Sequence, residues 1–134
     1  MNSYKIKRNI LYIGESCVKF KYPIKEIISK ANILIVLLKI PYNIELSSEE
    51  LNNVYGVNDK CEKFWRVEDI LVRFEGSDVD EDIRKARSPI YVGMWLGSNE
   101  EVVIRTFNSF EYEIDYKTGK IKREVLPSKK QRPW

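Results

Sequence analysis

The chain has 134 residues, of which 43% are hydrophobic and 32% are charged, with 6 glycines and 5 prolines. This composition is typical of one folded domain and excludes a disordered or collagen-like chain. The sequence contains no histidine, which excludes histidine-based general base catalysis, Ser-His-Asp triads and most transition-metal sites.

The net charge of +3 is unevenly distributed along the chain. Residues 1–8 carry +3 and residues 121–134 carry +4, so residues 9–120 carry −4. We therefore expect an acidic body with basic ends. Residues 1–126 are expected to form a single β-rich domain. Residues 127–134 contain two prolines and several charges, and we expect an extended or flexible basic tail there.

Short β-favouring runs separated by turn residues follow one another along the chain. Residues 10–13 and 17–22 flank Gly14 as in a hairpin, and residues 33–40 are apolar on both faces, as in a central strand. Residues 54–57 and 64–67 form a second hairpin pattern. Four further runs predict a C-terminal meander, with a tight turn at Gly119: residues 89–96, 101–107, 110–114 and 121–126.

Up to three short helices are expected between these strands. In residues 23–32, Ile24, Ile27 and Ile28 have helical spacing after a proline that suits a first turn. Ser47 or Ser48 could cap a second helix, and residues 75–88 are a long loop or a short surface helix. The predicted fold is mainly β, an antiparallel meander of about eight or nine short strands forming a barrel or a sandwich.

Nothing in the sequence predicts secretion or membrane insertion. The most apolar stretch, residues 33–40, is too short to span a bilayer, and the N-terminus lacks the apolar core of a secretory signal. We therefore expect a cytoplasmic protein in which Cys17 and Cys61 remain thiols.

Acidic residues gather in one charged segment after the second hairpin. Asp78, Asp80 and Asp82 alternate as in a calcium loop, but Ile83 and Pro89 occupy the positions of the required glycine and glutamate, so no metal is expected. The segment is either a solvated loop or a docking patch for a basic protein partner. The candidate partner-binding residues are Glu75, Asp78, Asp80, Glu81, Asp82, Glu49 and Glu50.

Two resemblances accompany these patterns. The segment NVYGVNDKCEKFWRV resembles the V-x-A-x-D-x-x-G-x-x-x-W hairpin of quinoprotein-type β-propeller blades. Over most of the chain, the succession SCVKFKYPIKEI, an apolar strand, NVYGVND and YEIDYKTGKI resembles small bacterial single-domain proteins, some of which look like immunity partners of polymorphic, contact-dependent toxins. The resemblance implies a protein that binds a cognate toxin.

Three functions follow as hypotheses. The first is a non-catalytic, cofactor-free immunity protein that binds and neutralises a toxin. The second, less favoured because the body is acidic, is a weak nucleic-acid-binding β-barrel module. The third is a histidine-free enzyme using Glu111, Glu113 and Asp115, which are more simply the solvent face of a strand. Pairing of edge strands into a homodimer is also compatible with the predicted fold.

Overall fold

The computed structural model describes residues 3–41, 50–69, 90–107 and 109–125. Within these residues the chain forms eleven strands in three antiparallel sheets, and neighbouring strands in each sheet are consecutive in sequence. Sheet A contains β1 (Tyr4–Lys7), β2 (Ile10–Ile13) and β3 (Ser16–Lys19). Sheet B contains β4 (Ile24–Lys30), β5 (Ile33–Leu38), β6 (Val54–Val57) and β7 (Lys63–Arg66). Sheet C contains β8 (Tyr91–Leu96), β9 (Val102–Thr106), β10 (Glu111–Ile114) and β11 (Ile121–Glu124).

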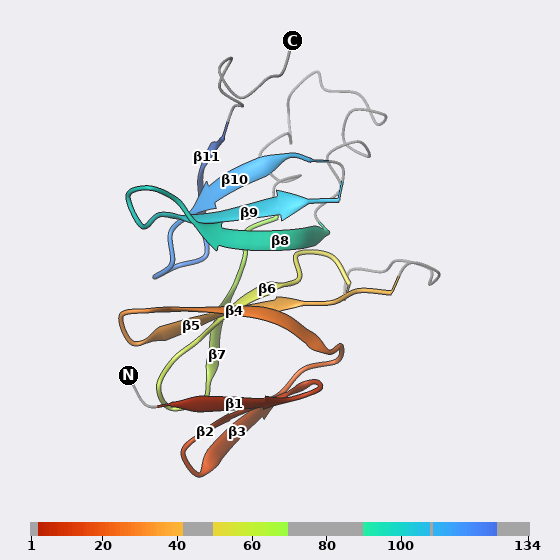
Figure 1. Cartoon of the computed structure of the whole chain (residues 1–134), viewed down its shortest axis with the longest axis vertical. Coiled ribbons are helices and arrows are strands. Elements are labelled where there is room, and N and C mark those ends of the chain that lie inside the picture. The colour runs from red at the N-terminus through yellow and green to blue at the C-terminus, as the bar shows by residue number, and fades with distance from the viewer. Residues whose placement is uncertain (1–2, 42–49, 70–89, 108, 126–134) are drawn as a thin grey trace.

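The three sheets lie in layers, with sheet B between the other two (Figure 1). Strand β5 explains this arrangement, because Leu34, Val36 and Leu38 pack with Leu11 and other residues of the sheet A side, whereas its alternate residues face sheet C. Successive side chains of a strand point to opposite faces, so a strand that is apolar throughout needs a cover on both sides. The prediction of a buried central strand at residues 33–40 is confirmed for residues 33–38, where β5 ends.

The expected barrel or two-layer sandwich is replaced by this three-layer stack. Each described sheet ends in edge strands and does not close on itself. The physical reason is that sheet B buries apolar side chains on both faces, which a barrel wall or a sandwich half would not do. The C-terminal meander and the two hairpins are confirmed, whereas β1 was not among the predicted strands.

The helix predicted at residues 23–32 is wrong, because this segment is strand β4. A bulge between Ile24 and Glu26 shifts the register, and Ile27 and Ile28 then point to opposite faces. Because the bulge shifts the register and both faces of β4 are covered, apolar residues are needed at positions i, i+3 and i+4. This is also the spacing of the apolar face of a helix. The helix predicted after Ser47 or Ser48 begins outside the described residues, but residues 50–53, where it would continue, form turns and bends instead of a helix. The third predicted helix, at residues 75–88, and the basic tail lie outside the described residues.

Two buried side chains hold sheets B and C together. Asn53, which is 1% exposed, donates from Nδ2 to the carbonyls of Leu38 (2.7 Å) and Tyr91 (2.8 Å), and its Oδ1 accepts the backbone N–H of Tyr91 (2.8 Å). Trp65 of β7 lies against Gly56, and its Nε1 donates to the carbonyl of Tyr116 at 2.9 Å. These contacts fix the position of the β10–β11 turn and of β8 relative to sheet B.

Trp65 also lies against Gly119, which has a φ of +76°. This positive φ is the conformation expected for a glycine in the turn between β10 and β11.

Among the described residues there is no helix long and apolar enough to cross a membrane.

Candidate functional site

The predicted acidic docking patch lies mostly outside the described residues. Glu75, Asp78, Asp80, Glu81, Asp82 and Glu49 belong to that undescribed part of the chain. The seventh residue, Glu50, is described and is 4% exposed. Its Oε1 accepts a hydrogen bond from the hydroxyl of Tyr22 at 2.9 Å. Glu50 therefore contributes to a partly buried contact with the segment that precedes β4.

Only two of the three carboxylates of the enzyme hypothesis, Glu113 and Asp115, line a common hollow. Glu111 and Glu113 lie on the outer face of sheet C, where Glu111 is paired with Arg105 and Glu113 with Val103. Asp115 follows the strand, and its Oδ1 accepts the backbone N–H of Lys117 at 2.9 Å, which caps the β10–β11 turn. Glu113 was expected on a solvent face but is 9% exposed.

Glu113 is held by two cations of β11. Its Oε1 lies 2.9 Å from Nε of Arg123, and its Oε2 lies 3.1 Å from Nζ of Lys122. Adjacent strand residues normally point to opposite faces, but the irregular register of β10 and β11 between Glu113 and Ile114 lets both cations reach one carboxylate. Burial acts to raise the pKa of Glu113, whereas the hydrogen bonds and charges of Lys122 and Arg123 lower it and prevail. A carboxylate held in its ionised form is a poor general acid.

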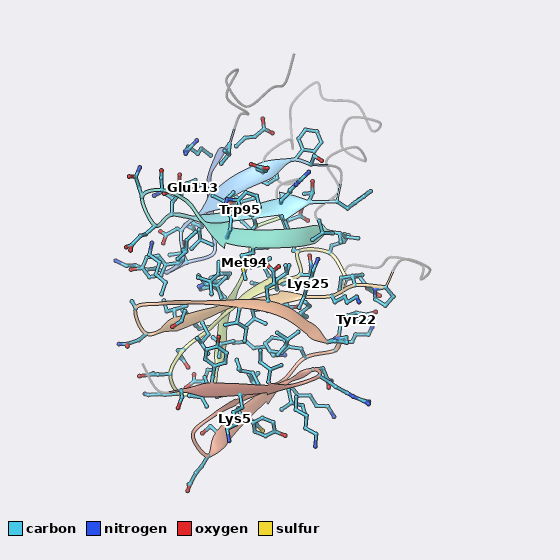
Figure 2. All side chains as sticks on the ribbon, viewed as in Figure 1. Lys5, Tyr22, Lys25, Met94, Trp95 and Glu113 are labelled. Atoms are coloured by element: carbon cyan, nitrogen blue, oxygen red, sulfur yellow. The ribbon has the colours of Figure 1, made fainter. Side chains whose placement is uncertain are left out.

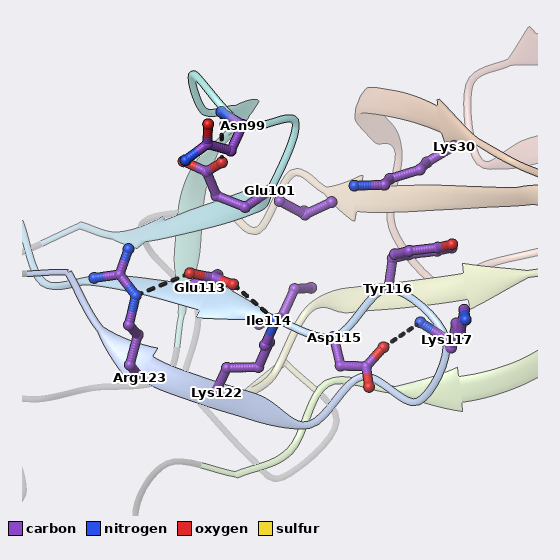
Figure 3. A pocket seen from close by; sticks show the side chains of 11 residues that line it. Lys30, Asn99, Glu101, Glu113, Ile114, Asp115, Tyr116, Lys117, Lys122 and Arg123 are labelled. Atoms are coloured by element: carbon purple, nitrogen blue, oxygen red, sulfur yellow. Dashed lines mark hydrogen bonds and ion pairs between the residues drawn. The ribbon is translucent and has the colours of Figure 1, made fainter.

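A hollow of about 490 Å³ opens beside this ion-paired group (Figure 3). It lies at the end of sheet C between the β8–β9 turn, the β10–β11 turn and the end of β4. The lining residues are Lys30, Asn99, Glu101, Val102, Glu113, Ile114, Asp115, Tyr116, Lys117, Lys122 and Arg123. The Nζ of Lys30 lies 4.8 Å from the centre of the Tyr116 ring, which joins sheet B to the rim of the hollow.

Strand β1 forms a free edge of sheet A. All four of its residues are exposed, and its described pairing is with β2 alone. Tyr4 and Ile6 lie opposite Ile13 and Leu11, so they share the face that packs toward sheet B. Ile13 and Leu11 are 3% and 0% exposed, whereas Tyr4 and Ile6 are 36% and 44% exposed. At β1 the apolar face of sheet A therefore extends beyond the part of this face that is buried against sheet B.

The opposite face of sheet A is basic. The pairing register places Lys5, Lys7 and Lys19 on that face, around the exposed ring of Tyr12. Figure 2 shows Lys5 on the side of sheet A that points away from the other two layers. Cys17 pairs with Tyr12 on the same face and is exposed, whereas the second free thiol, Cys61, is buried.

The alternation of strand β1 could be detected in the sequence, whereas the burial of Glu113 could not. In residues 4–7, YKIK, apolar and basic residues alternate as in a strand. The burial of Glu113 gives no local signal, because its neighbours Val103, Lys122 and Arg123 lie on other strands. Within the four described ranges, no three Cys, Asp or Glu side chains gather closely enough to hold a metal ion.

Comparison with known proteins identifies a family without a described activity. No curated protein and no solved structure matches the chain. One family model, described as "Domain of unknown function (DUF7957)", matches residues 1–106, which end with the last residue of β9. Since this match covers more than half of the sequence, the chain belongs to the DUF7957 family.

Proposed function

We propose that this chain is a non-catalytic protein-binding domain that binds and neutralises a toxin protein in the cytoplasm, as its resemblance to immunity proteins implies. The observation that carries the proposal is the free edge strand β1, with its uncovered apolar side chains Tyr4 and Ile6. An exposed sheet edge offers unpaired backbone groups to an added strand, and adjacent apolar side chains give such an addition affinity and register.

The charges beside this edge define the partner strand. Lys5 and Lys7 project from the face opposite Tyr4 and Ile6. Opposite charges across a strand pair are stabilising and like charges are destabilising. The proposed partner segment is therefore extended, with apolar residues on one face and acidic residues on the other. Two copies of this chain paired edge to edge with their faces aligned would place lysine against lysine, which disfavours a homodimer through β1.

The test is co-expression with the protein encoded by the neighbouring gene, which is the candidate toxin. Wild-type protein is expected to protect the cells and to co-purify with the toxin. Ile6→Asp, which places a charge in the apolar strip, is expected to lose both properties while keeping the fold. Phe107→Asp is the matched control, because Phe107 is 59% exposed and directly follows β9 of sheet C, away from β1. Absence of protection by the wild type, or equal loss in both variants, would count against the proposal.

The basic face of sheet A favours a second candidate, the binding of single-stranded nucleic acid. Lys5, Lys7 and Lys19 could contact phosphates while the ring of Tyr12 stacks on a base. Such binding is expected to weaken steeply as salt rises, because counterions are released from the nucleic acid. Fluorescence anisotropy with a short single-stranded oligonucleotide, at about 20–200 mM salt, measures this binding. The absence of binding at the lowest salt concentration would contradict this alternative.

A further inference from the structure

We infer that the hollow beside Glu113 is a binding site for a small organic phosphate, with Arg123 and Lys122 as its principal ligands. The site is assembled from three segments distant in sequence, namely the end of β4, the β8–β9 turn and the region from β10 to β11. Its volume of about 490 Å³ falls within the range of small-molecule pockets in proteins. It lies on a different sheet from β1 and does not depend on the proposed toxin binding.

Cationic groups around the hollow have hydrogen-bonding capacity left over. Arg123 uses only its Nε, on Glu113, and its two terminal nitrogens bond no other described residue. The ammonium of Lys117 contacts only the ring of Tyr116, at 5.8 Å, within the described part of the chain. A guanidinium with a free pair of terminal nitrogens can bind phosphate oxygens through two parallel hydrogen bonds.

Protein donors already engage the carboxylates around the hollow. Glu113 is shared by two cations, and Glu101 accepts the backbone N–H of Asn99 at 2.9 Å. Asp115 accepts the backbone N–H of Lys117. The lining therefore contains four cations against three carboxylates, and the cations have the unused donors. This balance favours an anionic ligand over a cationic one.

Glu113 acts as a positioning residue in this site. It fixes the guanidinium of Arg123 through Nε and the ammonium of Lys122 through Nζ, so both cations are held at the wall of the hollow in a defined geometry (Figure 3). Groups held in this way lose less freedom when a ligand binds. The negative charge of Glu113 also lowers the affinity of the hollow for an anion. Removing this charge should therefore raise the affinity for phosphate if the hollow binds anions, whereas a purely structural role of Glu113 predicts no such gain.

The test is a titration of the full chain with inorganic phosphate, followed by amide chemical shifts at constant ionic strength. We expect saturable shifts confined to residues 99–102, 113–117 and 122–123. Arg123→Gln and Lys122→Gln are expected to weaken phosphate binding by about tenfold, the usual effect of losing one charge-assisted hydrogen bond. Glu113→Gln is expected to strengthen it, because the amide oxygen still accepts from Arg123 but no longer repels the anion.

Controls and alternative anions make the result decisive. Lys60→Gln, at an exposed position in the turn between β6 and β7 that does not line the hollow, is expected to leave phosphate binding unchanged. Acetate is expected to bind more weakly than phosphate, and equal binding would overturn the assignment of a phosphate ligand. The absence of saturable shifts, or weaker binding by a folded Glu113→Gln variant, would overturn the site itself. Lys122 is 57% exposed, so its substitution tests the site without placing the fold at risk.

Discussion

Replacing Asn53 by alanine tests the connection between sheets B and C. Three hydrogen bonds of 2.7–2.8 Å join the Asn53 side chain to Leu38 and Tyr91, and all three groups are buried. At about 1 kcal/mol net for each hydrogen bond, the variant should lose about 3 kcal/mol of unfolding free energy. That is a large fraction of the roughly 5–15 kcal/mol that stabilises a typical domain.

Urea denaturation followed by circular dichroism measures this loss. With a slope of about 2 kcal/mol per molar urea, the midpoint should fall by about 1.5 M. Asn58→Ala is the matched control. The side chain of Asn58 accepts two hydrogen bonds, from the N–H groups of Lys60 and Glu62 at 3.0 Å, but it does so in a turn where water can replace them. If Asn53→Ala is no more destabilising than Asn58→Ala, the inferred junction between the sheets is wrong.

Three further predictions follow from other contacts. In Gly56→Ala the new Cβ would overlap the Trp65 ring, so we expect a loss of about 1–3 kcal/mol of unfolding free energy in urea denaturation; an unchanged midpoint would contradict the contact. Cys17 should react with an aromatic disulfide reagent in the native protein, whereas Cys61, whose pKa is raised by burial, should react only after unfolding; two reactive thiols in the native state would refute the burial. Because the folded-state pKa of Glu113 is below its ordinary value of 4.5, its ionised form stabilises the fold above that pH, and this contribution is lost as the pH falls through the folded-state pKa. The stability difference between wild type and Glu113→Gln should therefore shrink from pH 7 to pH 3, and a constant difference would count against the ion pairs.

The sequence predicted those strands whose pattern depends on local neighbours. Residues 33–38 are apolar throughout, and β5 is buried on both faces. The turn at Gly119 was predicted from composition, and its positive φ agrees. In these places the local preference and the tertiary environment favour the same conformation.

The failures occur where distant parts of the chain determine the outcome. Ile24, Ile27 and Ile28 have helical spacing, but a bulge and cover on both sides make the segment an edge strand of sheet B. The number of layers was also not predicted. The sequence of β5 indicates that both of its faces are covered, but it does not indicate which elements cover them. Glu113 was placed in solvent because alternation along β10 says nothing about the cations that β11 brings to it.

The candidate binding surfaces show the same limit. The alternation of residues 4–7 is visible in the sequence, but only the register with β2 shows that Tyr4 and Ile6 continue a buried face beyond its cover. The hollow beside Glu113 combines residues up to 93 positions apart, from Lys30 to Arg123. No local pattern connects those positions.

Hydrogen exchange of the chain alone and in complex with the candidate toxin, the protein encoded by the neighbouring gene, tests the central claim most directly. Addition of a partner strand at the edge of sheet A should slow exchange at the backbone amides of residues 4–7, whose strand pairs on only one side among the described residues. Exchange in sheet C should be unchanged. Protection confined to sheet C, or unchanged exchange at residues 4–7 in a stable complex, would contradict the account.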